Sequence, residues 1–417
     1  MNKHRLRNPL RNWAYGLLAL GVVGVNANAA SDMDKLVDRR TPLVIDFLGG
    51  TYLPGAKSIV VSGAFGLVGQ LKIDGEAATL EKVAGVPNVD FTAIHKLSDT
   101  SVLLGTSKGK IFLYDGGKVT EVATISEFEE PVLDIVTASS GAWAVGARGL
   151  VAHSADGKTW EKVDIKNVAQ PVVNLPDAKQ GEWYFGASNL IPESVKFVGN
   201  VGGRPAANEQ DYTLFPDEGY IQLNKDFDAE PAPSITFNFN PGPAFRPGDV
   251  SWNVVLAEGD TITIAGEFGL VLQSTDAGKT WVRRDTILSP KEPEPAYWTT
   301  GVHHGDTIWL AGAAGVSRAS KDRGLTWTAA PSSGSEGIFG MTLTSGGQPV
   351  IAGAVGLIGV LDNDKWKTAD RTELNLLSWL KTPVEMPDGT LVILGGRSTA
   401  ILYKDGAWKR IPVTTVK

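Results

Sequence analysis

The chain has 417 residues, and its content of 42% hydrophobic and 20% charged residues is typical of a globular protein rather than a disordered one. Its 48 glycines, 23 prolines and 12 tryptophans favour many short strands and tight turns over long helices. The absence of cysteine excludes disulfides, thiolate metal sites and cysteine nucleophiles, and the formal net charge of -7 argues against a nucleic-acid partner.

The first 29 residues have the pattern of a signal peptide. Four basic residues between Lys3 and Arg11 precede an apolar segment, 14–25, that is too short to span a bilayer comfortably. Small residues of the kind found at a cleavage site follow at Ala27 and Ala29. We therefore expect cleavage near Ala29 and a periplasmic or secreted mature chain without a membrane span; a membrane anchor is the alternative.

A short apolar strand that ends in a glycine-containing turn recurs along the chain, as in Val60-Val61-Ser62-Gly63-Ala64-Phe65-Gly66. The first glycine of this turn is found at Gly63, Gly105, Gly146, Gly266, Gly312, Gly353 and Gly395. Neighbouring copies lie 41 to 46 residues apart, except for one gap of 120. Four-stranded propeller blades have periods of about 40–50 residues. The repeats therefore predict an all-β fold, a β-propeller that occupies residues 30–417 as a single domain.

The one long gap contains a weaker copy of the repeat. The segments 171–174 and 181–186 resemble 131–134 and 141–146, which lie 40 residues earlier. The pattern then fails for about thirty residues and resumes near 220–223. We expect residues 188–216 to be an insertion within that blade. Eight copies favour eight four-stranded blades, and seven is the alternative, in which the insertion displaces the fourth copy.

A second motif follows several of the turns. It reads Ser-x-Asp-x-Gly-x-Thr-Trp in 274–281 and 320–327, and it is one residue shorter in 154–160. The Asp carboxylate can accept hydrogen bonds from the backbone amides of its own turn. The Gly can adopt a positive φ, and the large face of the Trp can pack between blades. The residues to which we assign this structural role are Asp156, Trp160, Asp276, Gly278, Trp281, Asp322, Gly324 and Trp327.

This motif is the Asp-box, or BNR repeat, and together with the glycine turns it resembles the Ycf48-like repeats of photosystem II assembly factors. The resemblance covers the mature chain from about residue 50 to the end, apart from the insertion. The first two repeats depart from it, because Asp74-Gly75 and Asp115-Gly116 keep the turn but lack the Trp. The resemblance implies a propeller with an assembly or accessory role, in some exported bacterial proteins beside transporters of the RND type.

Asp-boxes are also common in sialidases and other glycosidases, so a carbohydrate-active protein is the alternative function. Such catalysis needs two converging carboxylates, or a Tyr nucleophile with an arginine cluster on the sugar carboxylate. Arg410-Ile411-Pro412 resembles the Arg-Ile-Pro motif of sialidases but lies in the last strand rather than early in the domain. We therefore expect no enzyme; a sugar-binding module without turnover is a third possibility.

In propellers, the turns between the second and third strands open on the binding face, and the Asp-box turns lie on the opposite face. The binding candidates at these turns are Phe65, Lys108, Arg148, Glu267, Phe268 and Arg397. Exposed aromatic residues beside arginine suit a protein-binding surface. The alternative is that the apolar tips fill the central channel.

We expect neither a metal nor a cofactor. The neighbours His303 and His304 would point to opposite faces of a strand, and no metal or nucleotide motif is present. The acidic residues of the insertion lack calcium-loop spacing, although long insertions often carry recognition. The sequence thus predicts a non-catalytic interaction scaffold, or an assembly or accessory factor, for a protein partner in the cell envelope.

Overall fold

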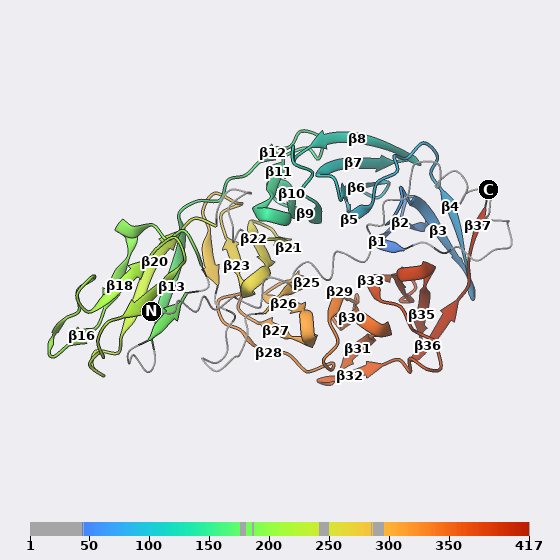
Figure 1. Cartoon of the computed structure of the whole chain (residues 1–417). Helices are drawn as coiled ribbons and strands as arrows, with labels where there is room; N and C mark the ends of the chain where they lie inside the picture. The colour runs from blue at the N-terminus through green and yellow to red at the C-terminus, as the bar shows by residue number, and fades with distance from the viewer. Residues whose placement is uncertain are drawn as a thin grey trace, which may run out of the picture. The chain divides into compact units, whose positions relative to one another are not determined.

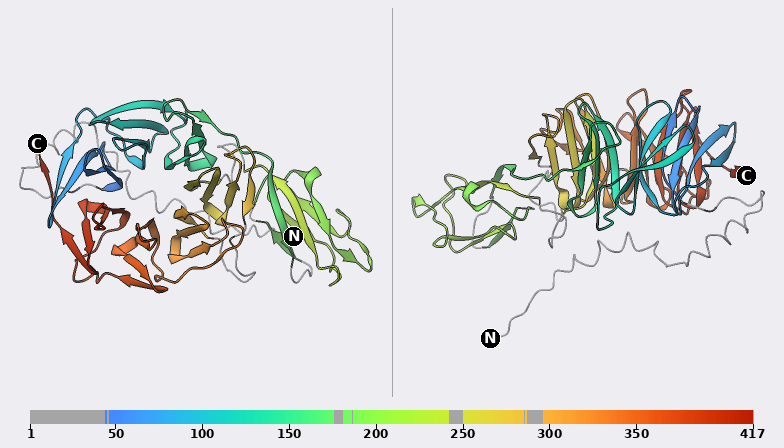
Figure 2. Two further views of the ribbon diagram at one scale, coloured as in Figure 1. Left: turned by 180° about the vertical axis from the view of Figure 1, so that it is seen from behind. Right: turned by 90° about the horizontal axis from the view of Figure 1, so that it is seen from above.

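The computed structural model describes residues 44, 46–175, 181–185, 187–241, 250–284, 286 and 296–416. The expected signal peptide, 1–29, lies outside the described residues. Within them, seven four-stranded antiparallel meanders follow one another around a ring (Figure 1), and two of them belong to larger sheets. Figure 2 shows the ring from behind and from its edge. The described part of the chain contains no helix with the length and hydropathy needed to cross a membrane.

Each blade is a meander of four strands from the inside of the ring to the outside. Blade 1 comprises β1 (Phe47–Leu53), β2 (Ser58–Gly63), β3 (Val68–Asp74) and β4 (Ala77–Lys82). Blade 2 comprises β5 (Phe91–Lys96), β6 (Ser101–Thr106), β7 (Lys110–Asp115) and β8 (Lys118–Thr124). Blade 3 comprises β9 (Val132–Ala138), β10 (Gly141–Gly146), β11 (Val151–Ser154) and β12 (Glu161–Lys162).

The remaining blades have the same order of strands. Blade 4 comprises β21 (Trp252–Glu258), β22 (Thr261–Gly266), β23 (Val271–Ser274) and β24 (Val282–Arg284). Blade 5 comprises β25 (Trp298–His304), β26 (Thr307–Gly312), β27 (Ser317–Ser320) and β28 (Thr328–Ala329). Blade 6 comprises β29 (Ile338–Leu343), β30 (Pro349–Gly353), β31 (Ile358–Asp362) and β32 (Lys365–Thr368). Blade 7 comprises β33 (Leu380–Glu385), β34 (Leu391–Gly395), β35 (Ala400–Lys404) and β36 (Ala407–Ile411).

The first glycine of the repeated turn allows the second strand to approach the innermost one closely. A Cβ on Gly146 would lie 2.0 Å from the carbonyl oxygen of Pro131, and one on Gly312 would lie 1.9 Å from that of Tyr297. Real Cβ atoms do not approach that closely, so a side chain at either position would displace the inner strand. This contact explains why glycine recurs at these two positions of the repeat.

The ring closes between its first and last blades. The inner strand β1 contacts β33, and the C-terminal strand β37 (Val413–Val416) pairs in parallel with β4 as a fifth strand of blade 1. Apolar side chains fill the space between neighbouring blades, as where Leu53 of blade 1 packs with Phe91 of blade 2. Full burial of a side chain of this size stabilises the fold by about 1.5–3 kcal/mol.

The chain leaves the ring between blades 3 and 4 and forms a second group of strands, which we call the insert. Its strands are β13 (Val168–Asn174), β14 (Glu182–Tyr184), β15 (Lys196–Val198), β16 (Asn200–Val201), β17 (Arg204–Pro205), β18 (Tyr212–Phe215), β19 (Tyr220–Leu223) and β20 (Ser234–Phe239). Strand β13 pairs with β20 and, in parallel, with β24, so the sheet of blade 4 continues into the insert. Strands β14, β19 and β18 make a separate three-stranded sheet.

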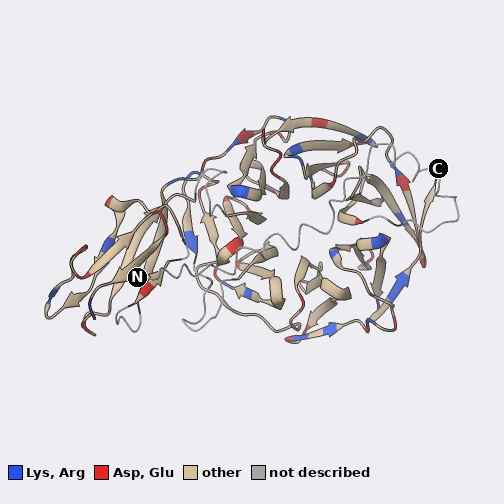
Figure 3. Cartoon of the chain, in the orientation of Figure 1, with Lys and Arg blue, Asp and Glu red and all other residues tan. Residues whose placement is uncertain are grey.

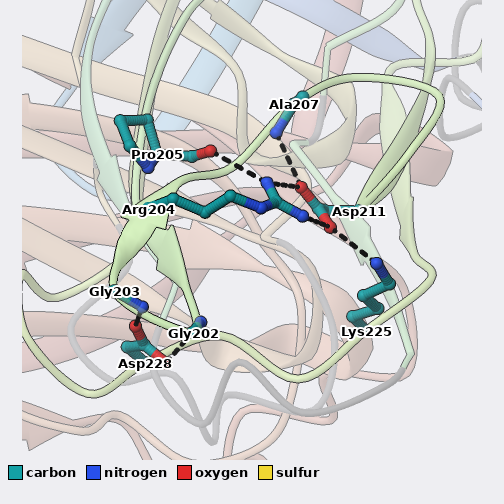
Figure 4. Close-up of polar contacts among 8 residues, drawn as sticks. All are labelled: Gly202, Gly203, Arg204, Pro205, Ala207, Asp211, Lys225 and Asp228. Atoms are coloured by element: carbon teal, nitrogen blue, oxygen red, sulfur yellow. Dashed lines mark hydrogen bonds and ion pairs between the residues drawn. The ribbon is translucent and has the colours of Figure 1, made fainter.

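A buried carboxylate organises one end of the insert (Figure 4). Asp211 has no exposed surface, and Arg204 donates to both of its oxygens, at 2.7 and 2.9 Å. The Ala207 amide and the Lys225 ammonium complete the set of partners, at 3.0 and 3.2 Å. The Arg204 guanidinium holds the pKa of Asp211 well below its usual range. The cluster therefore joins the β17–β18 connection to the residues that follow β19.

The described residues form seven blades, not the eight that the sequence favoured. The extra copy at 171–174 and 181–186 falls on β13 and on the segment of β14, and these two strands do not pair with each other. Residues 220–223 are β19, which pairs with β14 and β18. The expected insertion, 188–216, lies inside the insert, whose strands extend beyond it on both sides.

Candidate protein-binding face

The turns between the second and third strands of the seven blades gather at one end of the ring. They contain residues 64–66, 107–109, 147–149, 267–269, 313–315, 354–356 and 396–398. Because each blade is an antiparallel meander, the segment that leaves its outer strand for the next blade starts at this same end. We call the surface formed by these turns and connecting segments the turn-tip face.

Six of the seven turns place a residue other than glycine in the left-handed region. The central residues and their φ angles are Phe65 (55°), Arg148 (54°), Phe268 (57°), Ala314 (54°), Val355 (51°) and Arg397 (56°). This backbone conformation costs a residue with a Cβ about 1 kcal/mol, and it is an outlier for a β-branched side chain such as Val. The turns therefore hold these side chains in a conformation that glycine would adopt with less strain.

Hydrogen bonds from neighbouring segments hold the tips in place. The backbone N–H of Phe65 donates to Asp90 Oδ1 of the next segment at 2.9 Å, and that of Arg397 donates to Asp46 Oδ1 at 2.8 Å. Glu267 accepts a bond from the Ser251 amide at 3.0 Å, and its other oxygen lies 3.4 Å from the Tyr297 hydroxyl. The carboxylate of Glu267 is thus used to support the turn that presents Phe268.

Large apolar side chains are exposed on the turn-tip face. Phe65 is 66% exposed, Phe268 is 50% exposed and Val355 is 58% exposed. The connecting segments add Phe128 and Leu377, which are 64% and 84% exposed. Single exposed hydrophobics are ordinary, whereas several on one end of a ring mark a surface that a partner can cover.

The cations of this face differ in their pairing. Lys108 forms an ion pair with Glu129 at 2.5 Å. The exposed guanidinium groups of Arg148 and Arg397 have no ion pair with another described residue. Acidic and basic residues are interspersed along the described ribbon (Figure 3). The two guanidinium groups are available for planar, bidentate contacts with carboxylates.

The structure brings all six sequence candidates to one end of the ring, in equivalent turns. The turn that contains Lys108 differs from the other six turns. Its residue with positive φ is Gly109, at 63°, rather than a residue with a side chain. The candidate list missed Phe128 and Leu377. Both lie in segments between blades, which do not follow the repeat, so no periodic signal pointed to them.

The Asp-box turns lie at the other end of the ring and are occupied by their own hydrogen bonds. Asp276 Oδ1 accepts bonds from the Ser274 hydroxyl at 2.8 Å and the Thr280 amide at 2.9 Å. These Thr280 contacts lower the pKa of Asp276 to about 2. Asp322 and Asp156 accept the equivalent amide bonds from Thr326 and Thr159, at 2.8 and 2.7 Å.

The tryptophans of these motifs lie against the same turns. The indole N–H groups of Trp160, Trp281 and Trp327 donate to the carbonyl oxygens of Gly157, Gly278 and Gly324, at 3.3, 3.1 and 3.1 Å. Trp281 also packs edge-on against Trp143 of blade 3, with 6.0 Å between ring centroids. The motif therefore connects a turn of one blade to the side of the preceding blade.

Polar side chains on several inner strands form hydrogen bonds with a neighbouring blade. A β-bulge recurs near the start of every described inner strand, and the bulged residues are Leu48, Thr92, Leu133, Asn253, Thr299, Phe339 and Lys381. Three of them donate to the next blade, as where Asn253 Nδ2 lies 2.8 Å from the Trp298 carbonyl oxygen. At Thr92, Asn253 and Thr299 the bulge therefore turns a polar side chain toward the neighbouring blade.

Two charged residues of the inner strands, Asp134 and Lys381, influence each other's pKa. Asp134 accepts a bond from the Val255 amide at 2.9 Å, and Lys381 Nζ lies 3.3 Å from the Thr92 carbonyl oxygen. Burial raises the pKa of Asp134 to about 6 and lowers the pKa of Lys381. The charged group that acts on the pKa of Asp134 is the Lys381 ammonium. Among the described residues, no three His, Asp or Glu side chains meet in an arrangement for a metal.

The known structures that this chain is similar to share little sequence with it. No family model matches the chain, and no curated protein matches its sequence. A structure of "YCF48 bound to D1 peptide" is 16% identical, covers 68% of this chain and 67% of that chain, and has a TM-score of 0.40. "YCF48 from Cyanidioschyzon merolae" is 14% identical, with 67% and 84% covered and a TM-score of 0.31. The WD40 β-propeller domain of Doa1 is 9% identical, with 88% and 94% covered and a TM-score of 0.49. The propeller architecture is defined by the seven blades of the described residues themselves.

Proposed function

We propose that this protein is a non-catalytic scaffold whose turn-tip face binds a protein partner. The observation that carries the proposal is the set of Phe, Val, Ala and Arg side chains held at six equivalent turns in a strained backbone conformation. Such strain is a reason to suspect function, because the same turns could be built from glycine at lower cost.

The chemistry of the face fits a polypeptide. Phe65 and Phe268 offer apolar area, and Arg148 offers a planar donor group to carboxylates or carbonyl oxygens. This combination of aromatic residues and arginine is enriched at protein interfaces. The resemblance of the repeats to assembly factors favours a partner that belongs to a larger envelope complex, with a transporter of the RND type as one such partner.

Partner capture tests the proposal. The doubly substituted chain Phe268→Ser and Arg148→Glu should fold normally and capture its native partner from detergent-solubilised envelope at least ~tenfold more weakly, about 1.4 kcal/mol. The matched control makes the same two kinds of change at the Asp-box end, Leu325→Ser and Lys279→Glu, where both residues are exposed. Equal capture by both variants, with unchanged thermal melts, would exclude the turn-tip face as the interface.

A further inference from the structure

The three-stranded sheet of the insert carries a row of aromatic rings on its solvent side. Tyr184, Tyr220 and Phe215 are register partners on β14, β19 and β18. The ring centroids of Tyr184 and Tyr220 are 4.8 Å apart, and those of Phe215 and Tyr220 are 4.5 Å apart with an interplanar angle of 10°. Phe215 and Tyr220 are therefore stacked, and Tyr184 continues the row at an angle of 32° to Tyr220.

The stack has an open end. Strand β14 is the edge of its sheet, so no described strand lies beyond Tyr184, and this ring is 66% exposed. The neighbouring row on the same side of the sheet consists of Glu182, Gln222 and Thr213. We call these two rows together the aromatic face. Its carboxylate, amide and hydroxyl groups can bond to the backbone or side chains of a ligand.

The electrostatics of the aromatic face favour a cation. The Tyr184 hydroxyl donates to Glu182 Oε2 at 3.0 Å, and this bond raises the pKa of the tyrosine. Burial is the first cause of the raised pKa of Tyr220, and the charges of Glu182 and Glu218 add to it. The three strands and the turn at 216–219 contain no Lys or Arg. Within these described strands and this turn, acidic groups thus lie beside the aromatic rings without a Lys or Arg.

We propose that the aromatic face binds an arginine-bearing segment of a protein. A guanidinium group can stack on the open side of Tyr184 while it pairs with the Glu182 carboxylate, and only arginine combines both contacts in one planar group. The polar row beside the rings provides bonding groups for the backbone of the same segment. This surface lies on the insert and is separate from the turn-tip face, so it adds a second binding site to the scaffold.

A labelled short peptide with three arginines separated by glycine and serine tests the proposal by fluorescence anisotropy with the full chain. The peptide should bind, a lysine version should bind more weakly, and a glutamine version should not bind. Affinity should fall as salt rises, because the contact is partly ionic. Tyr184→Ala and Glu182→Gln should each weaken binding about fivefold, whereas Tyr184→Phe should retain most of it.

The matched control is Glu193→Gln, which removes an exposed carboxylate elsewhere on the insert and should leave binding unchanged. If Tyr184→Ala alters the thermal melt, Glu182→Gln still decides, because it preserves the ring stack. Equal binding of the glutamine peptide would overturn the proposal, because it would show that no cation is recognised. Equal weakening by Glu193→Gln would overturn it in favour of diffuse acidic charge. A neutral oligosaccharide that binds more tightly than the arginine peptide and displaces it would overturn it in favour of sugars.

Discussion

A Cβ atom on Gly278 of blade 4 would lie only 2.3 Å from Cη2 of Trp143 in blade 3. The φ angle of Gly278 is 91°, so both its backbone conformation and the approach of the indole require glycine. This contact crosses the boundary where the chain departs into the insert, and it joins the two blades without a direct covalent connection between them.

Gly278→Ala should therefore be strongly destabilising. The unfavourable φ costs about 1–2 kcal/mol, and the clash with Trp143 adds about 1–3 kcal/mol. Gly259→Ala is the matched control, because Gly259 has a φ of 58° but no atom lies within 4 Å of the Cβ that this substitution would add. Denaturant unfolding should show the larger loss for Gly278→Ala, and Trp143→Leu should recover part of it in the double variant. Equal losses at both glycines would mean that the indole moves aside freely.

Removal of an Asp-box carboxylate should lower stability without affecting partner capture. Asp276→Ala leaves the Thr280 amide and hydroxyl without their acceptor, so the melting temperature should fall by several degrees. Asp74→Ala, in the corresponding turn of blade 1 without the complete motif, should have a smaller effect. Loss of capture by Asp276→Ala at an unchanged melting temperature would show that the binding face is at the Asp-box end.

The complete insert should be dispensable for the ring. Deletion of 168–249 leaves seven residues, 163–167 and 250–251, to connect β12 of blade 3 to β21 of blade 4. The natural connection between β28 of blade 5 and β29 of blade 6 is similar in length, with eight residues, 330–337. The shortened chain should melt cooperatively, although at a lower temperature, because Val168 and Phe239 of the insert share a core with Trp143. Aggregation of this variant would mean that blades 3 and 4 need the insert.

A smaller deletion serves as the contrast. Removal of 190–215 would eliminate β15 to β18 together with the Asp211 cluster, and it would leave β19 and β20 with fewer partners. We therefore expect this shorter deletion to be more prone to proteolysis and aggregation than removal of the whole insert.

His95 should make the fold sensitive to acid. Its Nε2 accepts a bond from the Thr137 amide of the next blade at 3.1 Å, and burial lowers the pKa of His95 from 6.5 to about 4. The unfolded chain therefore binds the proton more readily, so stability should fall as the pH drops from about 6.5 to 4, by up to ~3 kcal/mol. In His95→Gln, which keeps an acceptor but does not titrate, this part of the pH dependence should disappear from thermal melts. An unchanged pH profile would assign the acid sensitivity to other groups.

The repeating part of the fold was predictable because each blade imposes the same local constraint on the sequence. The carbonyl oxygen of Pro131 leaves no room for a Cβ at Gly146, and the equivalent contact recurs at Gly312, so the glycine spacing reveals the blades. The number of blades was not predictable in this way. Residues 171–174 have the local pattern of a blade strand, but β13 pairs with β20 and β24, and that choice depends on distant residues.

The two candidate sites also differ in whether the sequence predicts them. The turn tips follow the repeat, so Phe65 and Phe268 could be placed at equivalent positions from sequence alone. The aromatic face could not, because Tyr184 and Phe215 are far apart in the chain and meet Tyr220 only through the pairing of three strands. Sequence periodicity reports contacts that each repeat makes, and it contains no information about a sheet that occurs once.

The most direct test of the central claim is an oxidative footprint of the turn-tip side chains in the complex captured from the envelope. Phe65 and Phe268 are exposed in the free chain, and both should become protected from hydroxyl radicals when the partner is bound. Leu325, which is exposed in an Asp-box turn at the other end of the ring, should react equally in the free and bound states. Protection of Leu325 with no change at Phe65 and Phe268 would contradict the assignment of the turn-tip face as the partner-binding surface.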